Sequence, residues 1–286
     1  MDVGGTTCDI GVLAGGYPRE SSIAVDIGGV RTNFRMPDVF SIGLGGGSKL
    51  VDGPCAGIDG HKTASAFAAI AATGDELVPA GAACSTAQIP CSNSPMLQAM
   101  LLGLPCDVHD AGILRDDLGV LERSLSALSK QVDIIVTTGG ASVGDRDFAQ
   151  AMFAGPGLET IFSKVAMKPG KPVWLARSSG RLVIGLPGNP TSAMVTGRLL
   201  LAPLVAGMAG RSGAAEWMNV PLAGPLPATG DRETFVRACR TESGAVPVTN
   251  QDSGSQSALI ASDLLIRCAP NSPSASPGTE VPALRF

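Results

Sequence analysis

The middle of the chain alternates short apolar runs with helical patterns, and this alternation narrows the fold more than any other feature. Between about Phe67 and Gly210, runs that read as strands lead into turns, and helical segments follow most of them. The strands we expect cover residues 67–73, 107–113, 133–136 and 182–185. Strands and helices in this order predict an α/β domain in which helices cover a parallel sheet.

Three helices have start signals in this segment. Asn93 should cap a helix that continues to about Leu104. Asp116 or Asp117 should cap the next one, which carries leucines at the helical positions 118, 121, 125 and 128. Asn189 and the proline after it should open a long helix that ends near residue 208.

The chain divides into four parts by composition. Residues 1–52 are dense in glycine, and residues 53–66 resemble a linker. Residues 67–210 form the expected α/β domain. Residues 211–286 show short apolar runs broken by Gly, Pro and Ser, which predicts a small β domain. The expected fold class is therefore α/β, with a parallel-sheet domain, a small C-terminal β domain and a glycine-rich N-terminal fragment.

Charge and composition limit the kinds of partner. The net charge of −4 gives no basic footprint for nucleic acid, and no apolar run reaches the length of a membrane span. The N-terminus lacks the features of a signal peptide. We therefore expect a small-molecule substrate, with neither nucleic acid nor membrane as a partner.

The cysteines and histidines point to a reducing compartment and to chemistry without zinc. The seven cysteines are odd in number and form no C-x-x-C pair, as is typical of reduced thiols in the cytoplasm. The two histidines lie in no zinc-ligand pattern. Chemistry in this chain should therefore depend on carboxylates, lysines, arginines and backbone amides.

Two loops after strands carry glycines and acids. Residues 133–148 read as a strand, a Thr-Thr-Gly-Gly turn, and a loop that ends in acids including Asp147. Such glycines let the backbone approach a ligand and bind an oxyanion, although a lone turn of this kind is more often an ordinary connection. Asp75 and Glu76 follow an earlier strand and could hold Mg²⁺ through oxygen, but alone they fit a solvated turn better.

Two other loops suit an anion. The turn 168–172, Lys-Pro-Gly-Lys-Pro, presents two lysines on a stiff backbone that fits a tetrahedral oxyanion, although exposed lysine pairs are common. Residues 185–192 join a strand to a helix N-terminus, whose free N–H groups favour an anion or simply form a capping turn. Together the four loops are typical of a site for phosphoryl or oxyanion transfer.

Two polar stretches of the last segment read as surface features when taken alone. Residues 232–237 should form a strand with its arginines turned away from Phe235. Residues 251–255 should form a polar loop.

Residues from about 70 to 286 closely resemble the molybdopterin molybdenumtransferases, the molybdenum insertases of the MoeA and gephyrin type. The order and spacing of the motifs make this resemblance specific. The matching motifs are Thr73–Leu77, Asn93-Ser94, Gly112-Ile113 with Asp116-Asp117, Thr138–Asp145, Lys168–Pro172 and Gly185–Pro190. Arg232-x-x-Phe235-x-Arg237 and Ser253-Gly254 resemble the C-terminal β domain of the family more loosely.

The resemblance implies insertion of molybdate into adenylylated molybdopterin, with Mg²⁺ as cofactor and release of AMP. The catalytic residues that it implies are Glu76, Asp147, Lys168 and Lys171. The metal ligands that it implies are Asp75, Glu76 and Asp147. The groups that would bind the pterin, its phosphates or molybdate are Thr73, Gly74, Asp75, Thr138, Gly139, Gly140, Ser142, Gly144, Pro187, Gly188, Asn189, Pro190, Arg232 and Ser253.

Residues 2–48 resemble a fragment of the hydantoinase A/oxoprolinase family. The matching stretches are Asp2–Gly11, Val30–Val39 and Gly43–Ser48, and the first carries the Asp-x-Gly-Gly-Thr phosphate-loop signature of actin-like and hexokinase-like ATPase folds. Some 50 residues cannot build that family's two-lobed nucleotide cleft, so we do not expect hydantoinase activity.

The N-terminal domains of molybdenum insertases, which help to form the dimer, have no counterpart that we can identify here. We expect this difference to weaken a homodimer. Three hypotheses therefore remain: a working insertase, a module that binds molybdopterin without turnover, and an inactive fusion with a hydantoinase remnant.

Overall fold

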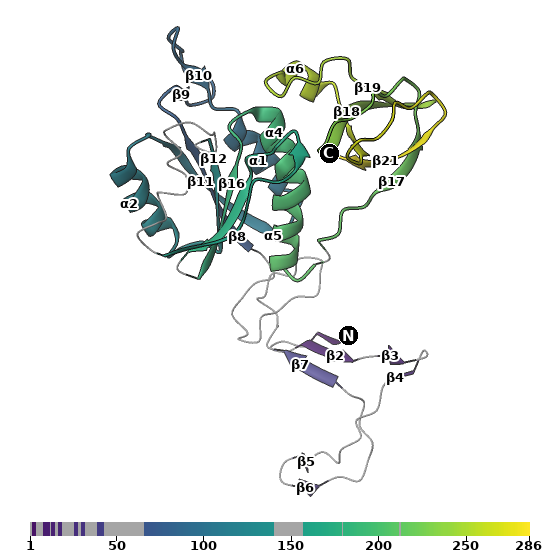
Figure 1. Ribbon diagram of the computed structural model, residues 1–286. Coiled ribbons are helices and arrows are strands. Elements are labelled where there is room, and N and C mark those ends of the chain that lie inside the picture. Colours follow the sequence, from purple (N-terminus) through teal and green to yellow (C-terminus); the bar gives the residue numbers. More distant parts are fainter. Residues whose placement is uncertain are drawn as a thin grey trace. The chain divides into compact units, whose positions relative to one another are not determined.

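The structure is a computed structural model that describes residues 66–139, 157–178, 180–211 and 213–286 (Figure 1). Before them it describes only the short strands β1 (Asp2–Val3), β2 (Cys8–Gly11), β3 (Leu13–Ala14), β4 (Tyr17–Pro18), β5 (Asp26–Ile27), β6 (Val30–Arg31) and β7 (Val39–Ile42). The rest of residues 1–52 and most of the expected linker lie outside the described residues. So do four predicted site residues, Gly140, Ser142, Gly144 and Asp147.

The α/β domain contains a six-stranded sheet of order β11-β8-β12-β16-β15-β13. Four parallel strands match the predicted ones: β8 (Ala66–Thr73), β11 (Cys106–Leu114), β12 (Ile134–Thr138) and β16 (Arg181–Leu186). Two antiparallel strands that the sequence did not predict, β15 (Trp174–Ser178) and β13 (Leu158–Ser163), extend one edge. The predicted α/β class is confirmed, and the sheet is mixed rather than purely parallel.

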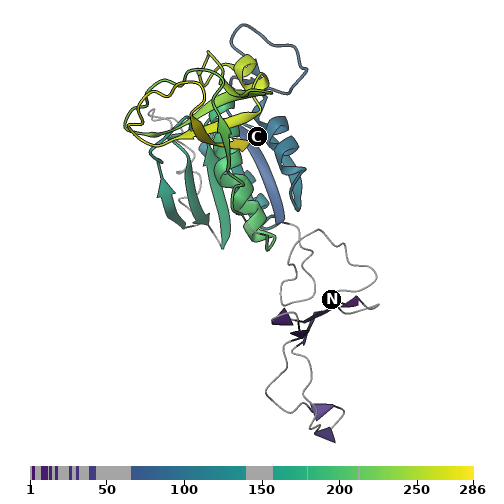
Figure 2. The ribbon, with the colours of Figure 1, turned by 90° about the vertical axis from the view of Figure 1, so that its right-hand side faces the viewer.

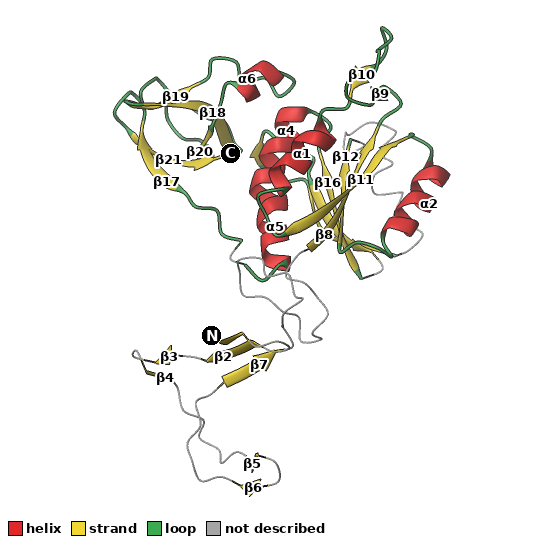
Figure 3. Ribbon diagram, turned by 180° about the vertical axis from the view of Figure 1, so that it is seen from behind, coloured by secondary structure: helices red, strands yellow, loops and turns green. Residues whose placement is uncertain are grey.

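Alternate residues of the central strands enter two separate cores, because successive side chains of a strand point to opposite faces. Ile70, Val136 and Ile184 belong to the core that includes the helices α1, α4 and α5. Ala69, Ile135 and Val183 belong to the core that includes α2. Figures 1 and 3 show α2 alone on one face of the sheet and α1, α4 and α5 on the opposite face. Both faces are therefore covered, which explains why the strands are almost continuously apolar.

The helices begin close to the predicted positions. Helix α1 spans Asn93–Leu101 with Ser92 as its N-cap residue, while the Asn93 Nδ2 donates to the carbonyl of Gly188 at 2.8 Å. Helix α2 spans Leu118–Leu128, and the Asp117 Oδ1 accepts from the Val120 N–H at 2.8 Å. Asp117 is therefore the cap of α2, whereas Asn93 connects α1 to another loop.

The predicted long helix is continuous from Pro190 to Met208. It consists of α4 (Pro190–Thr196), a π-helical turn (Gly197–Leu201) and α5 (Ala202–Met208). By length and composition this segment could cross a membrane, so the expectation that no apolar run is long enough was wrong. Its side chains Val195, Leu201 and Val205 are fully buried in the core of this domain, which explains its apolar character.

The C-terminal segment forms the predicted β domain. Its strands are β17 (Met218–Pro221), β18 (Glu233–Thr241), β19 (Gly244–Pro247), β20 (Leu264–Cys268) and β21 (Glu280–Arg285), with the short helix α6 (Gln256–Ile260). Figure 2 shows these strands in green and yellow. They enclose a core of their own, with Ala238, Ile266 and Ala283 among the buried residues.

One strand of the second sheet comes from the α/β segment. β14 (Met167–Lys168) pairs in parallel with β18, so that Lys168 lies opposite Thr234. The sheet order is β14-β18-β20-β21-β17, and β19 pairs with the far end of β18. The predicted two-lysine turn thus lies between β14 of the second sheet and β15 of the α/β sheet. A short ribbon, β9 (Leu77–Val78) with β10 (Ile89–Pro90), follows the predicted acids.

Candidate functional site

The carboxyl ends of β8, β12 and β16 meet at one edge of the sheet. Thr73 Oγ1 donates to the Thr138 carbonyl at 3.3 Å, and the Gly139 N–H donates to the Leu186 carbonyl at 3.3 Å. A Cβ added at Gly139, whose φ is +92°, would lie only 2.4 Å from the Thr73 carbonyl oxygen. Gly188 approaches from the third strand, since its own Cβ would lie 3.5 Å from Gly139 Cα. Glycine is therefore required at position 139 for these strand ends to come together.

The two neighbouring acids Asp75 and Glu76 face different cavities. Glu76 is exposed and lines the main cavity, with its carboxylate folded back over Gly74: a Cβ at Gly74 would lie 2.6 Å from Glu76 Oε2. Asp75 instead lines a neighbouring cavity of about 790 Å³, and its Oδ1 accepts from the Asp116 N–H at 3.3 Å. Asp116, which the sequence offered as a helix cap and as part of a family motif, lines the main cavity.

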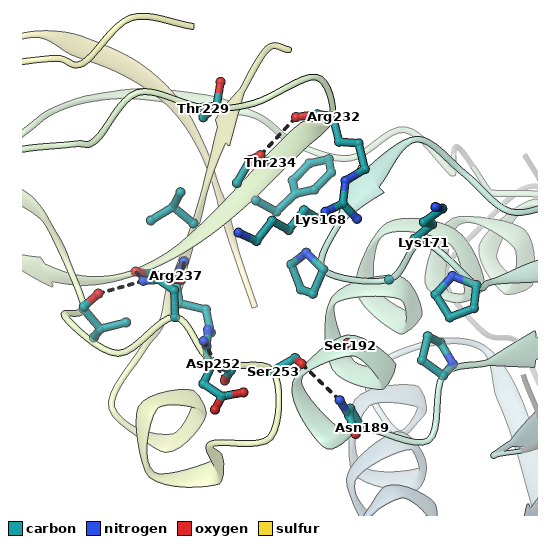
Figure 4. Close-up of a pocket in the computed structure, with 18 of the residues that line it drawn as sticks. Lys168, Lys171, Asn189, Ser192, Thr229, Arg232, Thr234, Arg237, Asp252 and Ser253 are labelled. Atoms are coloured by element: carbon teal, nitrogen blue, oxygen red, sulfur yellow. Dashed lines mark hydrogen bonds between the residues drawn. The ribbon is translucent and has the colours of Figure 1, made fainter. Parts of the chain in front are cut away.

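The basic side of the main cavity comes from the turn 168–172 and from the start of β18. Lys168 and Lys171 are exposed and line the cavity, as does the half-buried Arg232. An Nη1 of Arg232 donates to the carbonyl of Met167, the residue before Lys168, at 3.5 Å. The turn is held in place because Val165 N–H donates to the Lys171 carbonyl at 2.9 Å. Figure 4 shows these side chains in the cavity wall.

The loop 250–255 closes another side of the cavity. Ser253 Oγ accepts from Asn189 Nδ2 at 3.0 Å, so the Asn189 side chain binds the loop instead of capping α4 (Figure 4). Gln251, Asp252 and Ser253 all line the cavity. The sequence described this loop as a surface feature, and the structure makes it part of a cavity wall.

Arg237 contradicts the prediction that the arginines of β18 point away from Phe235. The two residues are two positions apart on one strand, where side chains share a face. Arg237 is only 1% exposed, and Phe235 is 7% exposed. Burial lowers the pKa of the Arg237 guanidinium, while the nearby Asp252 carboxylate opposes that effect. The sequence analysis assigned this arginine to the surface, although the spacing of two residues from Phe235 already indicated that both side chains share a face of the strand.

The cavity has a volume of about 1310 Å³ and is lined from both domains. Acids reach it from the loops after β8 and β11, and cations reach it from the turn 168–172 and β18. The predicted residues that it brings together are Thr73, Gly74, Glu76, Gly139, Lys168, Lys171, Pro187, Gly188, Asn189, Arg232 and Ser253. Three other predicted residues are described but do not line this cavity. Thr138 is the last residue of β12, immediately before Gly139, and Pro190 is the first residue of α4. Asp75 lines the neighbouring cavity.

The chemistry of this cavity suits a large, polyanionic ligand. Its volume exceeds that of typical pockets for small molecules, about 300–1,000 Å³. Lysines and arginines placed together provide charge-assisted hydrogen bonds to oxyanions. Among the described residues no three His, Cys, Asp or Glu side chains gather as a metal site. Glu76 and Asp116 nevertheless supply the one or two carboxylates with which Mg²⁺ usually joins a substrate phosphate.

Comparison with known proteins identifies relatives of both described domains. Residues 69–207 match the family model for a probable molybdopterin binding domain, and residues 219–286 match the MoeA C-terminal region, domain IV. The molybdopterin molybdenumtransferase of Haemophilus influenzae is 38% identical over 152 residues, which are 53% of this chain and 37% of that protein. The Bacillus subtilis protein of the same name is 34% identical over 136 residues, covering 48% of this chain and 32% of that protein.

Solved structures show the same relationship. A molybdopterin biosynthesis MoeA protein from Pyrococcus horikoshii has a TM-score of 0.68 at 28% identity, covering 78% of this chain and 55% of that chain. A second MoeA structure from the same organism has a TM-score of 0.62 at 22% identity, covering 78% and 54%, and supports the fold alone. The chain spans about a third of the length of these curated relatives and about half of the solved ones.

A third family model matches the other end of the chain. Residues 1–74 match the model for hydantoinase/oxoprolinase, which overlaps the molybdopterin-binding match by a few residues. Most of this match lies outside the described residues.

Proposed function

We propose that this chain inserts molybdate into adenylylated molybdopterin and releases AMP. The observation that carries the proposal is a single cavity in which the glycine-bordered strand ends and Glu76 face a cationic wall built from the turn 168–172 and β18. The similarity of both described domains to molybdopterin-binding and MoeA-type proteins supports the choice of substrate.

The cationic wall would bind the molybdate. Lys168, Lys171 and Arg232 would neutralise a tetrahedral dianion, and the Ser253 hydroxyl would donate a hydrogen bond to one of its oxygens. Held there, a molybdate oxygen would attack the phosphorus of the pterin phosphate. A new O–P bond would form at that phosphorus as the bridging P–O bond of the phosphoanhydride breaks, and AMP would leave with the bridging oxygen. Binding in a fixed orientation lowers the entropy cost of bringing two anions together.

The strand ends would bind the pterin substrate and its phosphates. Gly139 and Gly188 both line the cavity and carry no side chain, so a phosphate would be able to approach the backbone amides beside them closely. Thr73, Gly74, Thr138, Asn189 and the prolines 187 and 190 would shape this wall. The predicted residues Gly140, Ser142, Gly144 and Asp147 lie outside the described residues and stay proposed binding groups.

Glu76 would hold Mg²⁺, with Asp75 and Asp147 as the other predicted ligands and Asp116 as a further acid of the cavity. Bound Mg²⁺ would neutralise charge on the phosphoanhydride. We also propose that the protein acts in the cytoplasm, which its reduced thiols support: the five described cysteines are all free. A homodimer remains part of this proposal.

The experiment is a measurement of AMP release from adenylylated molybdopterin by the purified chain, with Mg²⁺ and with or without molybdate. We expect AMP release that requires molybdate and falls at least tenfold in Lys168→Met, a loss of about 1.4 kcal/mol of transition-state stabilisation. Lys130→Met changes an exposed lysine outside the cavity and should leave the rate unchanged.

Other outcomes of this experiment would contradict the proposal. Tight binding of the substrate without AMP release would reduce the chain to a molybdopterin-binding module. If the chain neither binds the substrate nor releases AMP, only its similarity of fold to these proteins would stand.

A further inference from the structure

Arg237 is a buried cation whose role the proposed set of substrate-binding residues does not explain. A guanidinium that is only 1% exposed is costly unless its N–H groups find acceptors. Among the described residues Arg237 takes part in no ion pair within 4 Å. Its stability in the fold therefore depends on the neutral acceptors around it.

Those acceptors lie on one loop and one helix. Nη2 donates to the carbonyls of Asn250 at 3.3 Å and Asp252 at 3.0 Å. Nη1 donates to the carbonyl of Ser255 at 3.4 Å and to Thr191 Oγ1, in the first turn of α4, at 3.2 Å. One guanidinium thus joins three main-chain carbonyls of the loop 250–255 to α4. The planar fork of arginine suits this task, whereas a lysine ammonium has a different geometry.

The main chain of Arg237 holds the same loop a second time. Its N–H donates to Gln251 Oε1 at 3.1 Å, and its carbonyl accepts from Gln251 Nε2 at 2.9 Å. The loop is further tightened within itself, since Asp252 Oδ1 accepts from the Gly254 N–H at 3.0 Å. Strand β18 therefore fixes both the path of the loop and the side chain of Gln251.

Ser253 lies in the middle of this loop and faces the cavity. Its hydroxyl accepts from Asn189, which is two residues before Thr191 (Figure 4). Arg237 and Asn189 thus connect the same loop, which carries Ser253, to the same end of α4. Arg237 itself lines the cavity, so its charge also acts on an anion bound there.

We propose that Arg237 is a positioning residue: its guanidinium holds the loop 250–255 against the first turn of α4, so that Ser253 faces the bound oxyanion. The identity of that oxyanion as molybdate rests on the proposed function. The position of the loop itself does not.

The test compares Arg237→Met with Arg237→Lys and with the control Arg240→Met. Arg240 lies on the same strand and is exposed. In Arg237→Met we expect the KM for molybdate to rise about tenfold or more, with little change in the KM for adenylylated molybdopterin. Arg237→Lys should recover part of this loss, because it retains the charge, and Arg240→Met should match the parent chain.

A double-mutant cycle shows whether Arg237 acts through Ser253. If it does, the loss in Arg237→Met with Ser253→Ala should be smaller than the product of the single losses. Fully multiplicative losses, or a rise in KM that is equal for both substrates, would overturn the proposal.

A second measurement keeps the inference testable if the chain releases no AMP. Hydrogen exchange of peptides covering 250–255 should lose protection in Arg237→Met while peptides of β12 and β16 keep theirs. Calorimetry with molybdate alone should show weaker binding in the same variant. Unchanged protection of the loop would refute the role of Arg237, whatever the outcome of the AMP assay. If Arg237→Met does not fold, Thr191→Val removes one acceptor of the guanidinium and should give the same changes in smaller measure.

Discussion

Replacing Gly139 with alanine tests the close approach of the strand ends on which the site depends. Two costs add up in this variant. An alanine at positive φ costs about 1–2 kcal/mol, and the smaller entropy of its unfolded chain returns about 0.4–1 kcal/mol. The new Cβ would also lie 2.4 Å from the carbonyl oxygen and 2.9 Å from the Oγ1 of Thr73. Forcing an atom into such a packed position typically costs a further ~1–3 kcal/mol.

Gly112→Ala isolates the second cost from the first. Gly112 also has a positive φ, +75°, but a Cβ there would have nothing within 4 Å. We therefore expect Gly112→Ala to lower the free energy of unfolding by roughly 1 kcal/mol. Gly139→Ala should lower it by about 3 kcal/mol, since it adds the steric cost.

Urea unfolding, followed by the fluorescence of Trp174 and Trp217, measures the difference between the two variants. Trp174 is almost fully buried beside β16, so its signal reports on the same sheet. Equal free energies of unfolding, within about 0.5 kcal/mol, would show that β8 and β12 do not converge as closely as described. A free energy of unfolding that is lower by about 2 kcal/mol in Gly139→Ala than in Gly112→Ala, together with weaker binding of the substrate, would support the geometry.

Two further predictions concern single groups. Gly74→Ala should displace the Glu76 carboxylate, which occupies the space of the new Cβ. The Mg²⁺ concentration that gives half-maximal AMP release should therefore rise severalfold. An unchanged Mg²⁺ dependence would show that Glu76 does not bind the metal. Burial, followed by the charge of Asp107, raises the pKa of the Cys106 thiol to about 11. Because the thiolate is the nucleophile, alkylation of Cys106 mapped by mass spectrometry should be slow at pH 8 compared with the exposed Cys84, and should accelerate up to about pH 11. Since the folded state keeps this proton longer than the unfolded state, Cys106 should favour folding below about pH 9 and lose that contribution as the pH rises toward 11. Rapid alkylation of Cys106 at pH 8 would contradict its burial.

The strands and helices of the α/β domain could be predicted because their signals are local. Four apolar runs became β8, β11, β12 and β16, and the leucines at helical spacing became α2. The antiparallel strands β13 and β15 escaped prediction. β13 lies between Gly157 and the two-lysine turn, and β15 lies between that turn and Gly180. Their pairing depends on a sheet edge that only the tertiary fold provides.

The loops that form the site could be predicted from the sequence, whereas the directions of their side chains and the hydrogen bonds between them could not. Thr73, Lys168 and Gly188 line one cavity as the order of the strands required. The split between Asp75 and Glu76 was not predictable, because neighbouring residues differ in direction only once the turn is known. The burial of Arg237 was not predicted, because charged side chains are usually exposed to solvent. Here the loop 250–255 supplies the hydrogen-bond acceptors that make burial possible.

The pairing of β14 with β18 has a consequence for how these domains can be inherited. A segment beginning near residue 213 would carry the start of β18 with its partner strand missing, and an unpaired strand edge invites aggregation with other chains. We therefore expect that the C-terminal domain does not fold well when it is separated from β14. Any rearrangement that transplants it into a new protein must also bring the two residues of β14, and with them Lys168. Selection against aggregation alone would thus keep this lysine-bearing turn and the arginines of β18 together.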